Sequence, residues 1–208
     1  MNHVVLLGDS IFDNARYVPG GSPIIEQLRA WLGKEWKATL IARDGACTDD
    51  ILRQLSQIPD DVSHLIISVG GNDALEFSGL LSSGGSVQEL LDRLTKVHEE
   101  FSDRYQSMLR DVLTLNLRTG VCTIYDRIPD LPKSNLTCLS IFNDVIFREG
   151  IRNRLPIVDL RVICDKSEDY SAVSSIEPSE KGGHKIVRAL RRMLTGHDFH
   201  SRESAVYI

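Results

Sequence analysis

The chain opens with the stretch Val4-Val5-Leu6-Leu7-Gly8-Asp9-Ser10-Ile11, a short apolar run that ends in Gly, Asp and Ser. The run shows no alternation of apolar and polar residues, which is typical of a strand covered on both faces. Four later runs have the same character, at residues 38–42, 65–69, 121–125 and 157–160. These five runs predict strands of a parallel sheet.

Amphipathic segments separate the runs and predict helices at 23–32, 49–55, 87–115, 139–152 and 179–194. Strands that alternate with helices favour a parallel sheet with helices on both faces. We therefore expect an α/β fold, a three-layer α/β/α sandwich of the flavodoxin-like kind with a five-stranded sheet. Residues 1–195 are predicted to form one domain, and residues 196–208 a polar C-terminal tail.

Composition narrows the class of protein. The chain has 208 residues, of which 42% are hydrophobic and 25% charged, and its formal net charge of -5 gives no reason to expect a nucleic-acid partner. The basic residues Arg188, Arg191 and Arg192 are interpreted as the solvated face of the last helix. Four cysteines without a C-x-x-C pair argue against a zinc site and a disulfide framework. The sequence has no signal-peptide pattern and no stretch of membrane-spanning length, so a cytoplasmic protein is expected.

Three polar blocks follow the first three predicted strands. They are Gly8-Asp9-Ser10-Ile11, Asp44-Gly45 and Gly70-Gly71-Asn72-Asp73. Each block alone is ordinary turn chemistry. In such a sheet, however, ligands bind beyond the carboxyl ends of the strands, where these blocks would meet. The Ser10 hydroxyl would then be a nucleophile. The backbone N–H groups of Ser10 and Gly45, with the Asn72 amide, would form the oxyanion hole that acyl transfer requires.

With these blocks in this order, the chain resembles the SGNH hydrolases, also called GDSL lipases and esterases. Gly8-Asp9-Ser10-Ile11 differs by one conservative change from the family's Gly-Asp-Ser-Leu, and Gly70-Gly71-Asn72-Asp73 follows the third strand as in the family. The resemblance runs from Val4 to the last helix. It implies that Ser10 is the nucleophile and that Ser10, Gly45 and Asn72 form the oxyanion hole.

The last block departs from the family, which has Asp, two residues, then His-Pro-Ser just before the final helix. Here the pair Pro178-Ser179 fixes the alignment, and it places Ser174 at the family's Asp and Glu177 at its His. The residues around the motif match the family, but its catalytic Asp and His are both replaced.

Three interpretations of this block remain open. Glu177 replaces the histidine as base, which requires burial beside Asp9, Asp13 or Asp73 to raise its pKa from about 4.3. Alternatively, His184 serves as base, although it would lie more than a turn inside the last helix. In the third interpretation, the base is lost.

The sequence thus predicts a serine hydrolase that acts through Ser10 and Glu177 on a small-molecule carboxylic ester, with a small acyl or acetyl group. No metal or organic cofactor is implied. The alternative is a degenerate member of the fold that binds an acyl or carbohydrate group without efficient turnover. A nucleotide-binding protein is disfavoured, because the loop after the first strand lacks a pattern that cradles phosphate.

Overall fold

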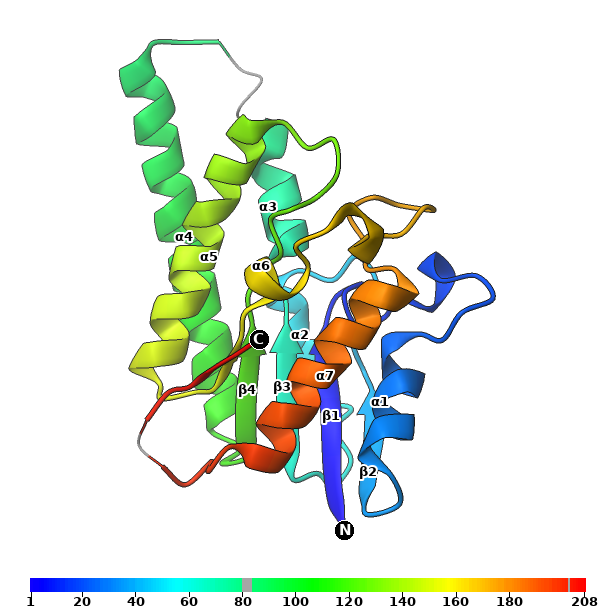
Figure 1. The fold of residues 1–208 in the computed structure, drawn as a ribbon. Helices are drawn as coiled ribbons and strands as arrows, with labels where there is room; N and C mark the ends of the chain where they lie inside the picture. The colour runs from blue at the N-terminus through cyan, green and yellow to red at the C-terminus, as the bar shows by residue number, and fades with distance from the viewer. Residues whose placement is uncertain (80–83, 202) are drawn as a thin grey trace.

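A computed structural model of the chain describes residues 1–79, 84–201 and 203–208. Its centre is a sheet of parallel strands in the order β2-β1-β3-β4-β5-β6 (Figure 1). The strands are β1 (Asn2–Gly8), β2 (Trp36–Leu40), β3 (His64–Ser68), β4 (Arg118–Cys122), β5 (Ile157–Val158) and β6 (Val206–Tyr207). The chain leaves β1 for the β2 edge and then returns to β3. The direction of winding therefore reverses at β1, and loops from both sides of this point converge beyond the carboxyl ends of the strands.

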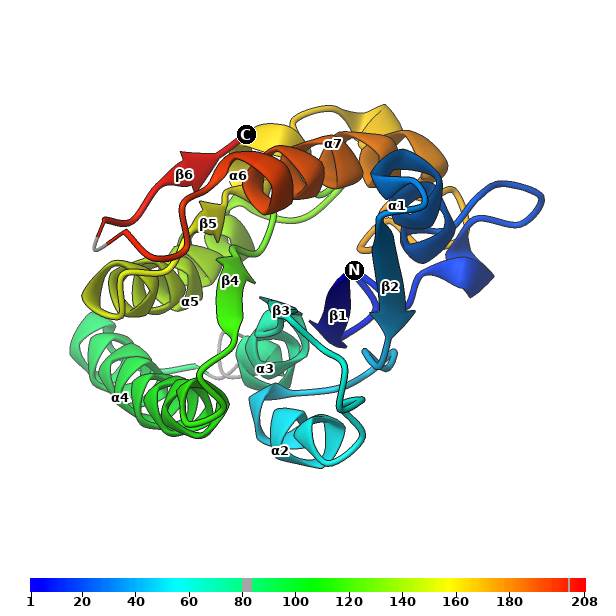
Figure 2. The ribbon, with the colours of Figure 1, turned by 90° about the horizontal axis from the view of Figure 1, so that it is seen from below.

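Helices cover both faces of the sheet, as Figure 2 shows. Helices α1, α6 and α7 lie on one face, and α2, α3, α4 and α5 on the other, each against its own apolar core. The helices are α1 (Ile24–Leu32), α2 (Ile51–Leu55), α3 (Gly71–Phe77), α4 (Val87–Leu113), α5 (Lys133–Arg152), α6 (Leu160–Ile163) and α7 (Glu180–Gly196), with short 3-10 helices at Ala15–Tyr17, Thr48–Asp50 and Ser167–Asp169. The architecture is therefore the predicted three-layer α/β/α sandwich.

The strand count of five is wrong, because the sheet has six strands. Part of the expected tail, Val206–Tyr207, pairs in parallel with β5 as β6. The N–H groups of Ile157 and Asp159 donate to Ala205 and Tyr207 at 2.8 and 3.0 Å. A strand this short carries no pattern of its own, so only its pairing with β5 defines it.

Helices α3 and α6 are not among the predicted helices, and α5 begins earlier than predicted. Helix α3 begins within Gly70-Gly71-Asn72-Asp73, which had been interpreted only as a turn. Helix α5 begins at Lys133, directly after Pro132 and before the predicted start at residue 139. Gly and Asn have low helix propensity, so tertiary contacts, not local preference, decide α3.

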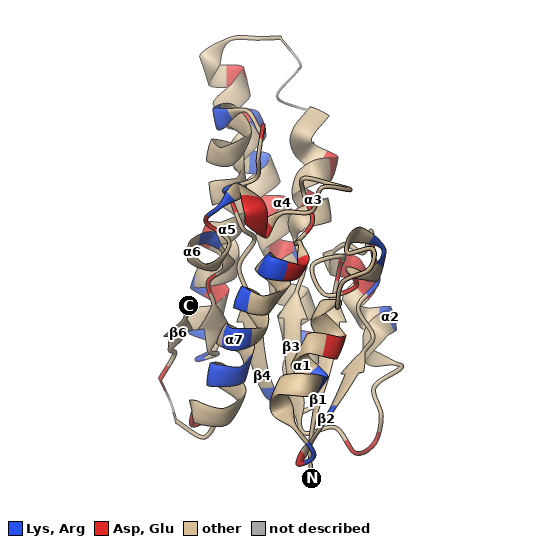
Figure 3. Cartoon of the chain, turned by 45° about the vertical axis from the view of Figure 1, so that its right-hand side comes forward, with Lys and Arg blue, Asp and Glu red and all other residues tan. Residues whose placement is uncertain are grey.

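The basic residues of α7 lie as predicted. Arg188, Arg191 and Arg192 are all exposed, on the face of α7 that turns away from the sheet (Figure 3). The opposite face of α7 is buried through Ile186, Val187 and Leu190.

The end of β1 approaches β3 so closely that only glycine fits at position 8. Gly8 has φ +129°, and a Cβ atom there would lie 1.8 Å from the carbonyl oxygen of Ser68. The side-chain amide of Gln54 on α2 binds both polar groups of Gly8, accepting from its N–H and donating to its carbonyl, each at 2.8 Å. The chain therefore leaves β1 in one fixed direction.

Replacing Gly8 by Ala is expected to lower the free energy of unfolding by at least about 2–3 kcal/mol, because the new Cβ meets backbone that cannot move aside. Urea unfolding measures the change. The control is Gly20→Ala, which has φ +78° but no atom within 4 Å of the added Cβ, and its cost is expected to be about 1 kcal/mol. Equal losses in the two variants would contradict the close approach of β1 and β3.

Candidate active site

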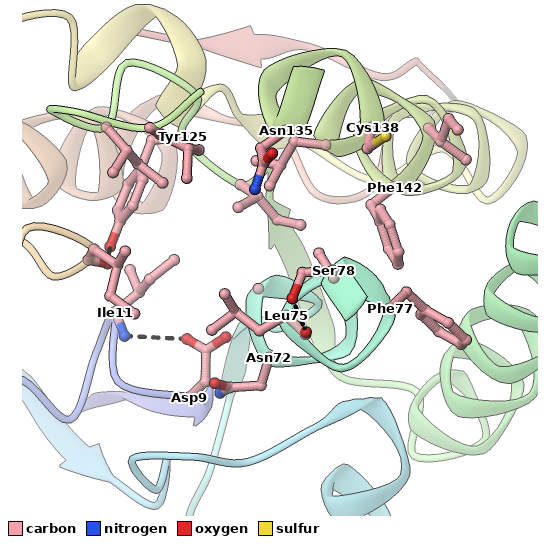
Figure 4. A pocket seen from close by; sticks show the side chains of 18 of the residues that line it. Asp9, Ile11, Asn72, Leu75, Phe77, Ser78, Tyr125, Asn135, Cys138 and Phe142 are labelled. Atoms are coloured by element: carbon pink, nitrogen blue, oxygen red, sulfur yellow. Dashed lines mark hydrogen bonds between the residues drawn. The ribbon is translucent and has the colours of Figure 1, made fainter. Parts of the chain in front are cut away.

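A pocket opens beyond the carboxyl ends of β1 and β3, at the point where the winding of the sheet reverses. Four polar side chains line one end of it, namely Asp9, Ser10, Asn72 and Glu177. Figure 4 shows Asp9 and Asn72 facing the same cavity from different elements. Residues from both ends of the sequence therefore meet at this end of the pocket.

Ser10 lies one turn after β1, and the backbone around it is fixed by Asp9. The N–H of Asp9 donates to Ser68 at 3.0 Å, and the Asp9 carboxyl accepts from the N–H of Ile11 at 3.0 Å. Ser10 itself is 7% exposed. Within the described part of the chain, its backbone N–H donates to no protein acceptor, so it is available to a ligand.

Asn72 contacts Ala46, the residue that directly follows Gly45. Asn72 is in the first turn of α3, and its Nδ2 donates to the Ala46 carbonyl at 3.0 Å. An amide nitrogen carries two hydrogens, so one remains for the pocket. Gly45 has φ +82° and an N–H with no acceptor among the described residues. Gly45 is exposed and does not line the pocket, but it directly precedes the residue that Asn72 contacts.

Two buried polar side chains, those of Asp73 and Gln54, hold these blocks together, and Gln54 is not among the residues that the sequence singles out. Asp73 accepts from both the N–H and the hydroxyl of Thr48, each at 3.0 Å for Oδ2, and so ties α3 to the segment after Gly45. Gln54 ties that segment to the end of β1 through Gly8. Both are polar residues in helical segments, and only the tertiary structure shows that they are buried.

The loop that carries Glu177 is held through its backbone. The Glu177 carbonyl accepts from Ser171 at 2.8 Å, and the Tyr125 hydroxyl donates to the Ile176 carbonyl at 2.6 Å. Ser171 in turn donates through its hydroxyl to Tyr17 at 2.5 Å. These bonds connect the loop to the segments that follow β1 and β4, and they bring Glu177 to the pocket.

The Glu177 carboxyl is buried, with 4% of the residue exposed. Burial raises its pKa to about 7, and repulsion from Asp44 adds to this, whereas the Ser10 side chain lowers it. Burial is the largest cause, as expected, but the carboxylate that adds to it is Asp44 and not Asp9, Asp13 or Asp73, which were the ones expected from the sequence. The buried Oε2 has no hydrogen-bond partner in the described residues.

Asp9 is a second carboxyl with a raised pKa. Burial raises it from 3.8 to about 8, and the charges of Glu177 and Asp73 act in the same direction, while the N–H of Ile11 opposes them. Asp9 therefore stays largely protonated at neutral pH.

A profile of the family described as GDSL-like Lipase/Acylhydrolase matches residues 4–190. The chain belongs to this family. Its members are lipases and acylhydrolases, and the sequence-based assignment as an esterase-type hydrolase is confirmed at that level. A search of curated proteins gave no significant match.

Several solved structures share the fold at low sequence identity. A lipase from a goat rumen metagenome is 15% identical, with a TM-score of 0.74 over 92% of this chain and 96% of that one. An acetyl xylan esterase is 16% identical, with a TM-score of 0.67 over 92% and 99%. A lipase/acylhydrolase from Enterococcus faecalis is 21% identical, with a TM-score of 0.61 over 92% and 96%.

The GDSL-like chain differs from the family pattern in its last block, and the structure places those residues. Ser174 contacts Glu177 through the backbone, accepting from its N–H at 3.0 Å. His184 lies elsewhere. It is exposed on α7, packs edge-on against Trp31 with 5.1 Å between ring centroids, and lines a separate hollow with Glu26 and Lys181. The fold therefore brings Glu177 to the Ser10 pocket and leaves His184 outside it.

No cluster of three or more His, Cys, Asp or Glu side chains suited to a metal ion occurs in the described ranges. Over the same ranges, no helix is both long enough and apolar enough to cross a membrane.

The raised pKa of Asp9 predicts how stability depends on pH. In the unfolded chain Asp9 loses its proton near pH 3.8, whereas the folded protein retains it to about pH 8. The folded state binds more protons between these values, so the free energy of unfolding falls as pH rises through this window, by at most about 1.4 kcal/mol per pH unit.

The variant Asp9→Asn keeps an acceptor for Ile11 but cannot ionise. We expect its stability, measured by urea unfolding from pH 4 to pH 8, to fall less steeply with pH than that of the wild type. Parallel curves for the two proteins would contradict a protonated Asp9 in the folded state.

Proposed function

We propose that this chain hydrolyses carboxylic esters, with Ser10 as nucleophile and Glu177 as general base. The observation that carries the proposal is that Ser10 and Glu177, far apart in sequence, line the same end of one pocket and that the pKa of Glu177 is about 7. An ordinary histidine has a pKa of about 6.5. A carboxylate with this basicity can take the proton that the family's histidine would take.

In the proposed reaction, the Ser10 hydroxyl attacks the ester carbonyl while its proton passes to the Glu177 carboxylate. The tetrahedral intermediate collapses, its bond to the alcohol oxygen breaks, and protonated Glu177 returns the proton to the departing alcohol. Water then attacks the acyl-serine ester while Glu177 takes its proton. The second tetrahedral intermediate collapses, its bond to the Ser10 oxygen breaks, and protonated Glu177 returns the proton to that oxygen, which releases the acid and restores Ser10 and the Glu177 carboxylate. Atoms and charges balance without a cofactor.

The oxyanion of both intermediates is proposed to be bound by three donors, namely the N–H groups of Ser10 and Gly45 and the amide of Asn72. The assignment is supported by the two N–H groups, which have no protein acceptor among the described residues, and by the Asn72 amide, which has a second hydrogen beyond its bond to Ala46. Each such donor commonly contributes about 3–4 kcal/mol to stabilisation of the transition state. In the family, an Asp orients the histidine base. Ser174 stands at that position and has no carboxylate, so the orientation of Glu177 is proposed to depend on the backbone hydrogen bonds of its loop.

Ser10→Ala is expected to lower kcat/KM for p-nitrophenyl acetate by about a thousandfold or more, because the nucleophile is lost. A fluorophosphonate probe should label the wild type and not the variant. An active Ser10→Ala enzyme would exclude this mechanism. A wild type that is neither labelled nor active would favour the alternative, a protein that binds its ligand without turnover.

The proposed base predicts a distinctive pH–rate profile. Glu177 accepts a proton only when ionised, so kcat/KM is expected to rise with pH through about 7 and then level off. Glu177→Gln should lower the rate by about a hundredfold or more and remove this limb. His184→Ala is the matched control, because His184 lies outside the pocket, and it should leave both rate and limb unchanged. A limb that disappears with His184→Ala instead would reverse the assignment of the base.

A further inference from the structure

Residues 13–17, which follow the end of β1, contact two other loops of the site. We call them the 13–17 segment, and they include the 3-10 helix Ala15–Tyr17. Asn14 is fully buried and Tyr17 is 9% exposed. Buried polar groups are normally hydrogen-bonded, so the partners of these two residues show what the segment holds in place. Those partners include the loop after β2 and the loop before α7.

The 13–17 segment holds the loop after β2 at two points. The N–H of Asp44 donates to the Asp13 carboxylate at 3.0 Å. The Tyr17 hydroxyl donates to the Asp44 carboxylate and lies 3.1 Å from each of its oxygens. Asp44 directly precedes Gly45, so these bonds fix the peptide whose N–H is one of the proposed oxyanion donors.

The same segment holds the loop that carries Glu177. The Ser171 hydroxyl donates to the Tyr17 carbonyl at 2.5 Å, and the Ser171 N–H donates to the Glu177 carbonyl at 2.8 Å. A longer bond of 3.4 Å runs from Nδ2 of Asn14 to the Pro178 carbonyl. Tyr17 therefore contacts one loop through its side chain and the other through its backbone.

We propose that Tyr17 is a positioning residue that holds the Gly45 donor and the Glu177 base in fixed places relative to Ser10. This inference rests on the proposed function. Tyr17 does not line the pocket, so it acts through the two loops and not on the substrate. Base and oxyanion donor must meet the same tetrahedral centre, and a displacement of about 1 Å can lower the rate about a hundredfold. Because Ser174 has no carboxylate to orient the base, the bond from Ser171 to Tyr17 gives the loop its fixed point.

The variant Tyr17→Phe removes only the hydroxyl that binds Asp44. We expect kcat for p-nitrophenyl acetate to fall by about tenfold or more and KM to change by about twofold or less, because an oxyanion donor acts on the transition state and hardly on the bound ester. A loss of folded protein alone would lower the amount of active enzyme and would not slow exchange-competent, fully folded molecules, so kcat is referred to the folded fraction measured by urea unfolding.

The matched control is Tyr170→Phe. The Tyr170 hydroxyl is also buried and also donates one bond, to the Cys164 carbonyl at 2.9 Å, but Tyr170 does not line the pocket and its hydroxyl does not contact the loop before Gly45. Its loss should cost similar stability and leave kcat unchanged. Equal losses of kcat in Tyr17→Phe and Tyr170→Phe would overturn the inference.

A second variant, Ser171→Ala, covers the case in which Tyr17→Phe does not fold. It removes the bond to the Tyr17 carbonyl and keeps the N–H that binds Glu177. We expect the same pattern, a kcat lower by about tenfold or more with KM nearly unchanged. An active wild type whose kcat is unaffected by both variants would also overturn the inference.

Hydrogen–deuterium exchange separates this inference from the proposed hydrolysis, since it needs no turnover. Tyr17→Phe should speed exchange of the amides at 43–48 by about threefold or more, because the loop opens more often, and Tyr170→Phe should not. Unchanged exchange would overturn the inference whether or not the protein is an esterase. Faster exchange in a protein whose wild type has no esterase activity would support the hold of Tyr17 on this loop and contradict the hydrolase.

Discussion

The close contact between the ends of β1 and β3 is the constraint on which the rest of the site depends. Gly8 lies against the Ser68 carbonyl, and the Gln54 side-chain amide forms hydrogen bonds with both the N–H and the carbonyl of Gly8. With the exit from β1 fixed in this way, Ser10 has little freedom in where it points. The same parallel edge brings the loops after β2 and β3 to Ser10, because the carboxyl ends of parallel strands lie on one side of a sheet.

Burial of carboxyl groups is the second constraint, and it sets the chemistry of the polar end. Asp9 and Glu177 are both buried, and among the described residues no Lys, Arg or His forms an ion pair with Glu177. Arg16, whose charge lowers the Glu177 pKa slightly, is mostly exposed and pairs with Asp44 at 2.7 Å. A carboxylate in an ordinary solvated site would be too weak a base to replace histidine. Burial removes the hydration of the Glu177 carboxylate and so raises its pKa above the value that the side chain has in water.

The polar end and the apolar part of the pocket are built from different kinds of element. Asp9, Ser10, Asn72 and Glu177 line one end of the pocket, and side chains of α3, α4 and α5 line much of the rest. The pocket therefore combines a polar end, built from loops at the sheet edge, with an apolar end built from helix faces.

The sheet, its parallel winding and the three blocks after the first strands could be predicted from the sequence. Each depends on a local pattern, namely an apolar run and the Gly, Ser or Asn residues at the end of that run. It also identified Glu177 as the residue at the family's histidine position, since Pro178-Ser179 fixed the alignment. The tertiary structure alone shows that Glu177 and not His184 lines the Ser10 pocket, because the loop before α7 is positioned by hydrogen bonds to Tyr17 and Tyr125, which are remote in sequence. Helix α3, strand β6 and the apolar part of the pocket are likewise seen only in the tertiary structure. Each depends on partners that lie far along the chain, and no local pattern records such contacts.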